Sequence, residues 1–245
     1  MPQCPVGRLV QLTRYPVKSM AGEELERADV AAYGLYGDRS HAFVDETKEG
    51  WDRYVTARQI APLLRWRATL GEGGTGSGEY PTVRIVSPEG EAFGWDGGLL
   101  RAVQRYTDRR LSLLRCRPDT GAGSAVDTGG ILIITDRSLS RLAALLGRHA
   151  DPRRFRANFI VALDGEDVPG EAGWVGRRLR IGGAVLEVTE PCERCSVIAI
   201  DPDTLARDSG LLRTVNDEMN LHFGVYASTV SAGTVGLGDV VLLEE

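Results

Sequence analysis

Lysine is nearly missing from this chain: of its 29 basic residues only Lys18 and Lys48 are lysines. Chemistry that requires a lysine amine, such as a Schiff base with pyridoxal phosphate, therefore has two possible positions, and we expect no pyridoxal phosphate. The other basic residues are arginines, whose planar guanidinium groups can hold a phosphate through two parallel hydrogen bonds.

Long apolar runs and a cysteine framework are missing as well. No segment approaches the roughly 20 apolar residues of a transmembrane helix, and the N-terminus lacks the apolar core of a signal peptide. Four cysteines in 245 residues are too few for a disulfide scaffold. The net charge of −5 gives no reason to expect nucleic acid or an anionic membrane as a partner. We therefore expect a soluble, cytoplasmic protein that binds neither.

Short apolar runs that end at turn residues occur along most of the chain, and such runs are typical of β-strands. A segment rich in Gly, Ser, Thr and Asp, 118–130, predicts a domain boundary. The sequence therefore predicts an α+β, β-rich protein with closed, barrel-like sheets, divided into residues 1–117 and 118–245. The expected strands include 5–14, 41–45, 63–70, 83–86, 131–134 and 159–163, with a strand pair over 179–188. Helices are expected over 98–110, from Thr135 or Asp136 to Gly147, and around 211–219.

The motif Cys192-Glu193-Arg194-Cys195 follows an apolar run and precedes the β-branched run 196–200, which we expect to be a strand. We expect an arginine beside each thiol in space or sequence, and a guanidinium there favours the thiolate, the form that attacks electrophiles and ligates soft metals. A thioredoxin-type pair is disfavoured, because its motif opens a helix.

Two further interpretations of the motif are also disfavoured. Structural zinc needs further Cys or His ligands at a recognisable spacing, and the remaining ones are scattered singly, so we expect no zinc. Two cysteines packed as small apolar side chains would have apolar neighbours, whereas Glu193 and Arg194 are charged. A soft ligand to a metal cofactor and a sulfur-carrying nucleophile both remain open.

Short polar motifs stand at the ends of several apolar runs, where side chains from different strands can meet at one mouth of a barrel. Hydroxyl groups, a flexible backbone, lysine and arginine suit an anionic, phosphate-bearing ligand. Each motif alone is typical of a solvated turn, but together they predict one anion site. The motifs are Lys18-Ser19, Asp38-Arg39, Thr56-Ala57-Arg58, Asp127-Thr128-Gly129, Arg153 to Asn158, and Glu193-Arg194-Cys195.

The order of these and other motifs resembles the MOSC proteins, named after the C-terminal domain of molybdenum cofactor sulfurase. It is similar in particular to amidoxime-reducing component-like proteins, in which an N-terminal β-barrel domain precedes a MOSC domain. The resemblance covers about residues 6 to 243 and implies these two domains over 1–117 and 118–245. Its motifs are Tyr15–Ser19, Gly37–Arg39, Thr56–Gln59, Phe155–Asn158, Glu171–Trp174, Cys192–Cys195, Asp201–Thr204, Phe223–Tyr226 and Gly238-Asp239.

The resemblance implies a molybdenum–pterin cofactor whose metal is ligated by Cys195. A thiolate is a soft donor suited to such a centre, and arginines can clamp its phosphate. Gly129 stands where amidoxime-reducing relatives carry serine, and Glu193 where they carry a smaller residue. The implied contacts to the pterin and phosphate are Lys18, Ser19, Arg39, Arg58, Thr128, Gly129, Arg156, Asn158, Glu193 and Arg194.

The effect of Glu193 beside the expected metal ligand stays open. Its carboxylate could raise the thiol pKa, repel an anionic substrate, exchange a proton during turnover or pair with Arg194.

The function that the resemblance implies is a molybdenum-dependent oxidoreductase that removes oxygen from a small N-hydroxylated or N-oxygenated substrate. The chain ends at Glu245 without a ferredoxin domain, so we expect a separate electron donor of the ferredoxin or cytochrome b5 type. Two alternatives remain: sulfur transfer through a persulfide on Cys195 or Cys192, and non-enzymatic carriage of the molybdenum cofactor.

Overall fold

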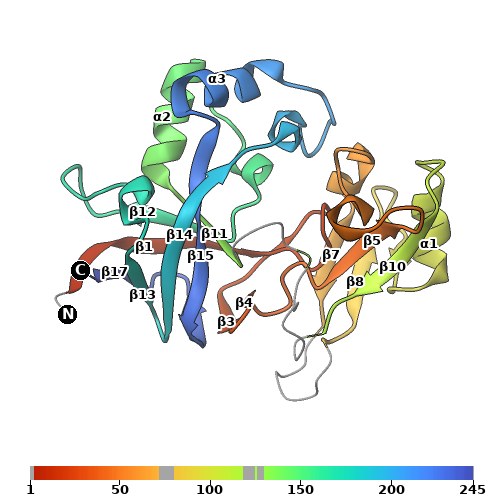
Figure 1. The fold of residues 1–245 in the computed structure, drawn as a ribbon, viewed down its shortest axis with the longest axis horizontal. Helices are drawn as coiled ribbons and strands as arrows, with labels where there is room; N and C mark the ends of the chain where they lie inside the picture. Colours follow the sequence, from red (N-terminus) through yellow and green to blue (C-terminus); the bar gives the residue numbers. More distant parts are fainter. Residues whose placement is uncertain (1–2, 72–79, 118–124, 126–129, 245) are drawn as a thin grey trace.

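The structure is a computed structural model that describes residues 3–71, 80–117, 125 and 130–244. Seven strands of this described chain close into a barrel in the order β12-β11-β15-β14-β13-β17-β1, with β1 pairing back onto β12 (Figure 1). All neighbours are antiparallel except β11 and β12. The strands are β1 (Gln3–Arg14), β11 (Ile131–Thr135), β12 (Phe159–Leu163), β13 (Arg178–Ile181), β14 (Ala184–Glu193), β15 (His222–Ser231) and β17 (Val240–Glu244).

The barrel interior is filled by apolar side chains of these strands. In β13 the buried Leu179 and Ile181 alternate with Arg178 and Arg180, as a strand with one face on a core requires. Trp174, at the end of the short turn η4 (Glu171–Trp174), is fully buried in this core, and its indole nitrogen donates to the carbonyl of Pro169 at 3.0 Å. The β-rich fold and its closed barrel therefore confirm the predicted fold class.

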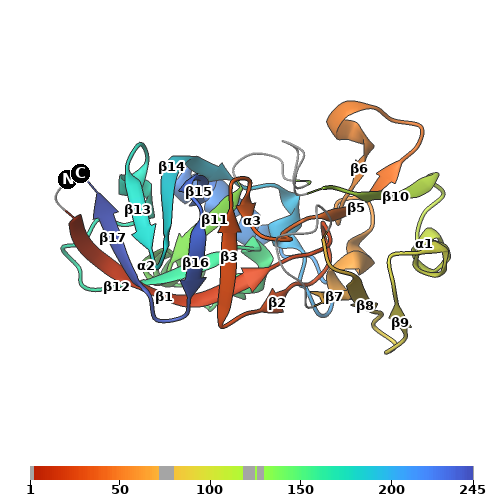
Figure 2. The same ribbon diagram turned by 90° about the horizontal axis from the view of Figure 1, so that it is seen from below.

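A second core lies around α1 (Gly97–Gln104), at the end of the molecule opposite the two chain termini, as Figure 2 shows. Phe43, Trp66, Ile85 and Leu99 are among its fully buried residues. Small three-stranded sheets surround it. They are β10-β5-β6, from Leu111–Arg115, His41–Asp45 and Tyr54–Val55, and β7-β8-β9, from Arg67–Leu70, Val83–Val86 and Ala92–Phe93.

The first segment of the chain also supplies strands to the barrel region. β1 lies between β12 and β17, β2 (Glu23–Glu24) extends it, and β3 (Arg27–Ala31) pairs with β16 (Gly233–Gly236) and β4 (Gly34–Leu35). Residues from before and after position 117 thus share one sheet. The domain division at 117/118 stays a prediction, and most of segment 118–130 lies outside the described residues.

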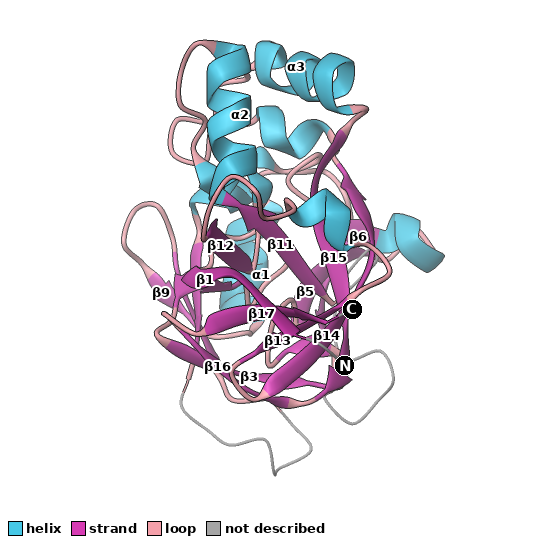
Figure 3. Cartoon of the chain, turned by 90° about the vertical axis from the view of Figure 1, so that its left-hand side faces the viewer, coloured by secondary structure: helices cyan, strands magenta, loops and turns pink. Residues whose placement is uncertain are grey.

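α2 (Asp136–Leu146) and α3 (Ser209–Met219) lie together on one side of the barrel (Figure 3). The Thr135 hydroxyl accepts from the amide of Ser138, and Gly147 ends α2 with φ 68°, so both predicted ends of this helix are confirmed. In the described chain no helix has the length and apolar composition needed to span a membrane.

Three sequence-based expectations were wrong in detail. The helix expected over 98–110 ends at Gln104, whose side-chain amide donates to the carbonyls of Thr107 and Arg109 and closes a turn there. The strand expected over 63–70 begins as the 3₁₀ turn η2 (Ala61–Arg65), because Pro62 favours a helical start and Leu63 is buried in that turn. The run 196–200 forms the 3₁₀ turn η5 (Ser196–Ala199) instead of a strand.

The reason for η5 is that its apolar residues pack in different directions. Ile198 lies in the core beneath α2 and α3, whereas Ile200 packs with Ala57 and Leu64 of the N-terminal region. A tight turn delivers both, which a pleated strand cannot do, so tertiary packing overrides β-propensity here.

His41 provides a test of the second core by pH. It is 1% exposed, its ring packs edge-on against Trp95 at 4.9 Å, and its Nδ1 contacts the Ser40 hydroxyl at 2.9 Å. Burial, aided by the charge of Arg115, lowers the pKa of His41 to about 4. The unfolded chain binds this proton near pH 6.5, so the stabilisation is complete above that pH and is lost as the pH falls toward 4.

We therefore expect His41→Gln to flatten the pH dependence of stability. Between pH 7.5 and 4.5 the free energy of unfolding of the unmodified protein should fall by roughly 2–3 kcal/mol more than that of the variant. Urea unfolding of both proteins at each pH measures the difference, in which shared carboxylate titrations cancel. Parallel pH curves would show that His41 does not titrate with folding.

Candidate functional site

A cavity of about 460 Å³ lies between the barrel and the N-terminal region, and residues of both line it. The structure brings nine of the eleven sequence-predicted site residues to this cavity; Thr128 and Gly129 lie outside the described residues. The nine residues in the cavity come from loops after β1 and β6, from the turn before β5, from the segment after η3 (Pro152–Phe155) and from the end of β14. The nine are Lys18, Ser19, Arg39, Arg58, Arg156, Asn158, Glu193, Arg194 and Cys195.

The two cysteines of the motif have opposite environments. Cys192 is 1% exposed at the end of β14, and Arg194 Nη1 donates to its sulfur at 3.0 Å. Cys195 is exposed and is the residue from which η5 begins. Arg194 thus lies beside Cys192 in space and beside Cys195 in sequence, and no guanidinium contact to the Cys195 sulfur is found among the described residues. Cys195 is the thiol that a ligand in the cavity can reach.

Arg194 itself is 8% exposed and bonded within the protein. Its Nη2 donates to the carbonyl of Phe155 at 2.6 Å, and its guanidinium lies over the Phe155 ring at 5.5 Å. The Arg194–Glu193 pair considered from the sequence is not formed, because no contact in the described chain joins the two side chains.

Arg39 and Arg156 form the part of the wall that spans the two regions. Arg39 pairs with Asp38 and donates to Asn158 Oδ1 at 3.2 Å and to the carbonyl of Arg156 at 3.1 Å. Both guanidinium groups lie over the ring of Tyr15, at 4.9 Å and 4.3 Å from its centre. Burial lowers the pKa of Arg39, but the Asp38 carboxylate outweighs it, so the net pKa is above the ordinary value.

Arg156 has a less favourable environment. Burial first, and the positive charge of Arg39 as well, lower the pKa of Arg156 to about 10, because no carboxylate is paired with it in the described chain. Its Nη1 donates to the carbonyl of Met20 at 2.8 Å, whereas its buried Nη2 has no partner. Nε of Arg194 is likewise buried without a partner. Unsatisfied buried donors cost stability, and oxygens of an anionic ligand would satisfy both.

Backbone conformation marks the same place. Six non-glycine residues in the described ranges have positive φ, and three of them line the cavity: Ser19 (70°), Arg39 (47°) and Arg156 (54°). Such conformations cost about 1–3 kcal/mol each and concentrate at functional sites. Their clustering around one cavity, far apart in sequence, indicates that the fold maintains this wall for a purpose other than packing.

The remaining predicted residues differ in role. Lys18 Nζ donates to the carbonyl of Ala125 at 2.8 Å, and the Ser19 hydroxyl accepts from the amide of Ala57 at 3.0 Å. Arg58 is held by Thr56, through an Nε to hydroxyl distance of 3.4 Å. Each of these leaves a polar side chain on the cavity wall.

Asn158 is bonded on both ends of its amide and is 1% exposed. Its Nδ2 donates to the carbonyl of Thr13 at 3.1 Å, and its Oδ1 accepts from the amide of Leu132 at 3.1 Å as well as from Arg39. The side chain therefore positions β1, β11 and Arg39 relative to one another.

Two polar residues of the wall, Glu190 and Tyr226, lie outside the six motifs predicted to form the anion site. Arg154 and Thr56 lie within two of those motifs but were not among the predicted contacts. Tyr226 lies within the motif Phe223–Tyr226 of the family resemblance, and this motif could have indicated that it belongs to the site. Burial first, and then the neighbouring Cys192 sulfur, with which it hydrogen-bonds, raise the pKa of Tyr226 well above its usual range. Its hydroxyl therefore stays protonated at neutral pH.

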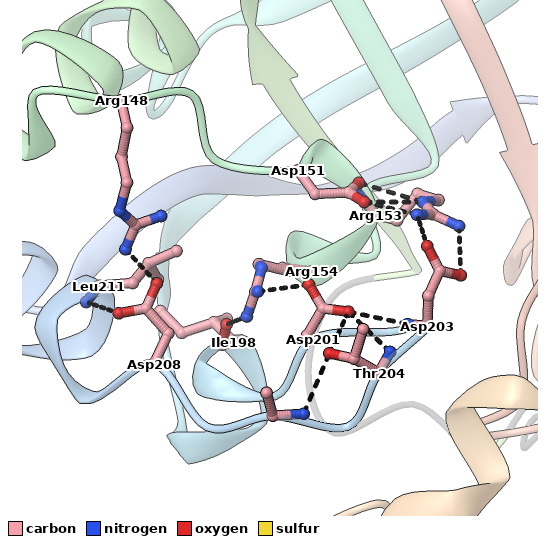
Figure 4. Close-up of polar contacts among 11 residues, drawn as sticks. Arg148, Asp151, Arg153, Arg154, Ile198, Asp201, Asp203, Thr204, Asp208 and Leu211 are labelled. Atoms are coloured by element: carbon pink, nitrogen blue, oxygen red, sulfur yellow. Dashed lines mark hydrogen bonds and ion pairs between the residues drawn. The ribbon is translucent and has the colours of Figure 1, made fainter.

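Arg154 holds η5 in place, as Figure 4 shows. Its guanidinium donates to the carbonyl of Ile198 at 3.3 Å and to Asp201 at 2.7 Å. Asp201 also accepts from the amide and hydroxyl of Thr204, and these bonds help to hold the pKa of the Asp201 carboxyl below its usual value. Because η5 begins at Cys195, this clamp fixes the backbone that presents the exposed thiol.

The charge of the wall is strongly positive in a protein whose net charge is −5. Among described residues it holds six basic side chains against two acidic ones, Glu190 and Glu193. No group of three His, Cys, Asp or Glu residues that could hold a metal occurs in the described chain, so a metal at Cys195 would need its other donors from a ligand. The basic residues are Lys18, Arg39, Arg58, Arg154, Arg156 and Arg194.

Comparison with known proteins identifies two domain families along the chain. A MOSC N-terminal β-barrel domain model matches residues 6–97, and a MOSC domain model matches residues 122–242. Mitochondrial amidoxime-reducing component 1 of Homo sapiens is 28% identical over 286 residues, covering 97% of this chain and 83% of the human protein.

Two further similarities are more limited. Molybdenum cofactor sulfurase of Drosophila melanogaster is 33% identical over 283 residues, but the chain spans only 35% of its length. The crystal structure of the YUAD protein from Bacillus subtilis superposes with a TM-score of 0.53 at 12% identity, covering 99% of this chain and 97% of the other, which shows a shared fold. Since the two domain models together span almost the whole chain, this protein belongs to the MOSC family, with a MOSC N-terminal β-barrel region before its MOSC domain.

Proposed function

We propose that this protein is a molybdenum cofactor-dependent reductase of small N-hydroxylated or N-oxygenated compounds, with Cys195 as the ligand to the metal. The observation that carries the proposal is the exposed Cys195 thiol opening onto a cavity with two buried, unpartnered guanidinium nitrogens. A soft sulfur donor and a strongly basic wall in one cavity suit a group that combines a metal with a phosphate.

The residues present fit such a group. Nη2 of Arg156 and Nε of Arg194 would donate to its anionic oxygens, and Lys18 and Arg58 would add positive charge nearby. Cys195 would supply the one protein sulfur to the metal. When bound, the molybdenum centre would supply two-electron oxygen-atom chemistry.

The net reaction breaks an N–O bond and consumes two electrons and two protons. Its products are the reduced nitrogen compound and water. The electrons would come from a separate donor protein of the ferredoxin or cytochrome b5 type. The similarity to amidoxime-reducing component 1 of Homo sapiens and of Mus musculus, each over 97% of this chain, supports this reaction class.

Sulfur transfer is the second candidate, and the exposed thiol of Cys195 is the observation that favours it. A persulfide there would be reachable from the cavity, and several relatives are named molybdenum cofactor sulfurase. Those proteins are matched over 18–35% of their length. Non-enzymatic carriage of the cofactor, the third candidate, needs the same cavity but no turnover.

Cys195→Ala tests the metal ligand. We expect the variant to lose bound molybdenum and to lose the reduction of benzamidoxime with an artificial electron donor, because the protein's one sulfur ligand is gone. Cys4→Ala, which removes an exposed thiol remote in sequence, is the matched control and should keep both. Elemental analysis and a turnover assay on the same preparations provide the measurements.

Two results would redirect the assignment. Retention of metal and turnover by Cys195→Ala would exclude the ligand role. A sulfur adduct on Cys195 after incubation with a cysteine desulfurase, detected by mass spectrometry in protein that turns over no N-oxygenated compound, would favour sulfur transfer.

Arg156→Gln tests the anion contact. We expect pterin retention after dialysis to fall by about tenfold or more, since charge-assisted hydrogen bonds contribute about 1.5–3 kcal/mol. Arg153→Gln is the matched control, because Arg153 is the exposed neighbour that pairs with Asp151 and Asp203 outside this cavity. Pterin fluorescence after oxidation gives the stoichiometry. Equal retention in the two variants would contradict the role of Arg156.

A further inference from the structure

Two carboxylates lie on the wall of the cavity that otherwise carries positive charge. Glu190 and Glu193 are both exposed, and both belong to β14 close to Cys195. Within the described chain neither side chain has an ion-pair or hydrogen-bond partner, whereas Glu187 of the same strand lies outside the cavity.

The strand is irregular where these glutamates lie. The register between β14 and β15 shifts between Val188 and Glu190 and again between Pro191 and Glu193. A β-bulge disrupts the alternation of side chains and re-aims them, and bulges are frequent next to active sites. As a result a short segment of one strand places Glu190, Cys192 and Glu193 on the same cavity.

The charges of the wall separate into two groups. Arg39 and Arg154 already pair with carboxylates, Asp38 and Asp201. Arg156 and Arg194 keep buried nitrogens for an anionic ligand. Once such a ligand is held, the charges left on the exposed part of the wall are the two carboxylates and Arg58, which leaves an excess of one negative charge; Lys18 is buried and donates to the carbonyl of Ala125. Both carboxylates stand on β14, the strand that leads to Cys195, whereas Arg58 follows β6, so a substrate approaching Cys195 along β14 meets negative charge.

We infer that Glu190 and Glu193 make the entrance beside Cys195 selective for cationic substrates, so that the preferred N-hydroxylated compounds carry a positive charge at a position away from the reacting nitrogen. This inference rests on the proposed function for the reaction itself. The carboxylates act by electrostatic attraction during binding and take no part in breaking the N–O bond.

A series of para-substituted benzamidoximes tests the inference on the cofactor-loaded protein. The trimethylammonium and tert-butyl compounds have the same shape and differ only in charge, and the carboxylate compound reverses it. We expect kcat/KM to fall in the order cation, neutral, anion, and the cation's advantage to shrink as salt is added. In the double variant Glu190→Gln/Glu193→Gln the ratio of kcat/KM for cation over neutral should fall about tenfold.

Glu187→Gln is the matched control, because it removes an exposed carboxylate of β14 outside the cavity and should leave that ratio unchanged. Binding of phenyltrimethylammonium, which cannot be reduced, provides a second measurement by calorimetry and should weaken in the double variant alone. Equal ratios in all proteins would overturn the inference while leaving the reductase intact. Glutamate-dependent binding of the cation without any amidoxime reduction would support the cationic entrance and reject the reductase.

Discussion

The amide of Asn158 is the contact on which the rest of this structure depends. It joins the carbonyl of Thr13 in β1 to the amide of Leu132 in β11, and it receives a hydrogen bond from Arg39, which belongs to the other core's side of the cavity. A single buried side chain therefore connects barrel closure with the position of a cationic wall residue. If the buried Asn158 amide lost one of these partners, the unpaired polar group would cost its full desolvation free energy. The hydrogen bonds of Asn158 are therefore coupled, and the loss of one weakens the others.

The cavity next to this contact lowers the stability of the folded protein as long as no ligand is bound. Arg156 is partly buried beside Arg39, with a lowered pKa and a buried, unpartnered Nη2, and three residues of the wall hold strained backbone conformations. Such features lower stability in the absence of a ligand, and a ligand that binds only the folded state returns that free energy. An anionic group is the one that relieves both the charge repulsion and the unsatisfied donors, which is why the site favours one chemistry.

The sequence predicted those parts of the molecule that local chemistry determines. The ends of α2 follow from the Thr135 hydroxyl and from Gly147, and β1 covers the strand expected over 5–14. The same reasoning failed at 196–200, where Ile198 and Ile200 belong to different cores and only the assembled fold decides the turn. Arg154 lies within a predicted motif, but its role in holding η5 could not be predicted for a related reason, because its partners Ile198 and Asp201 lie more than 40 residues away.

The cysteine motif shows how far spacing alone can go. The spacing of the motif gives no reason to expect different environments for its two thiols. Cys192 is nevertheless buried beside Arg194 and Tyr226, whereas Cys195 is exposed. The difference arises from the shifted register near Pro191 and from the clamp that winds η5 immediately after the strand. Cys192 thus serves the wall, by accepting the hydrogen bond that holds Arg194, and Cys195 is the thiol that stays exposed. The different exposure of the two cysteines therefore depends on the structure at the end of β14, and it cannot be predicted from the spacing of the motif.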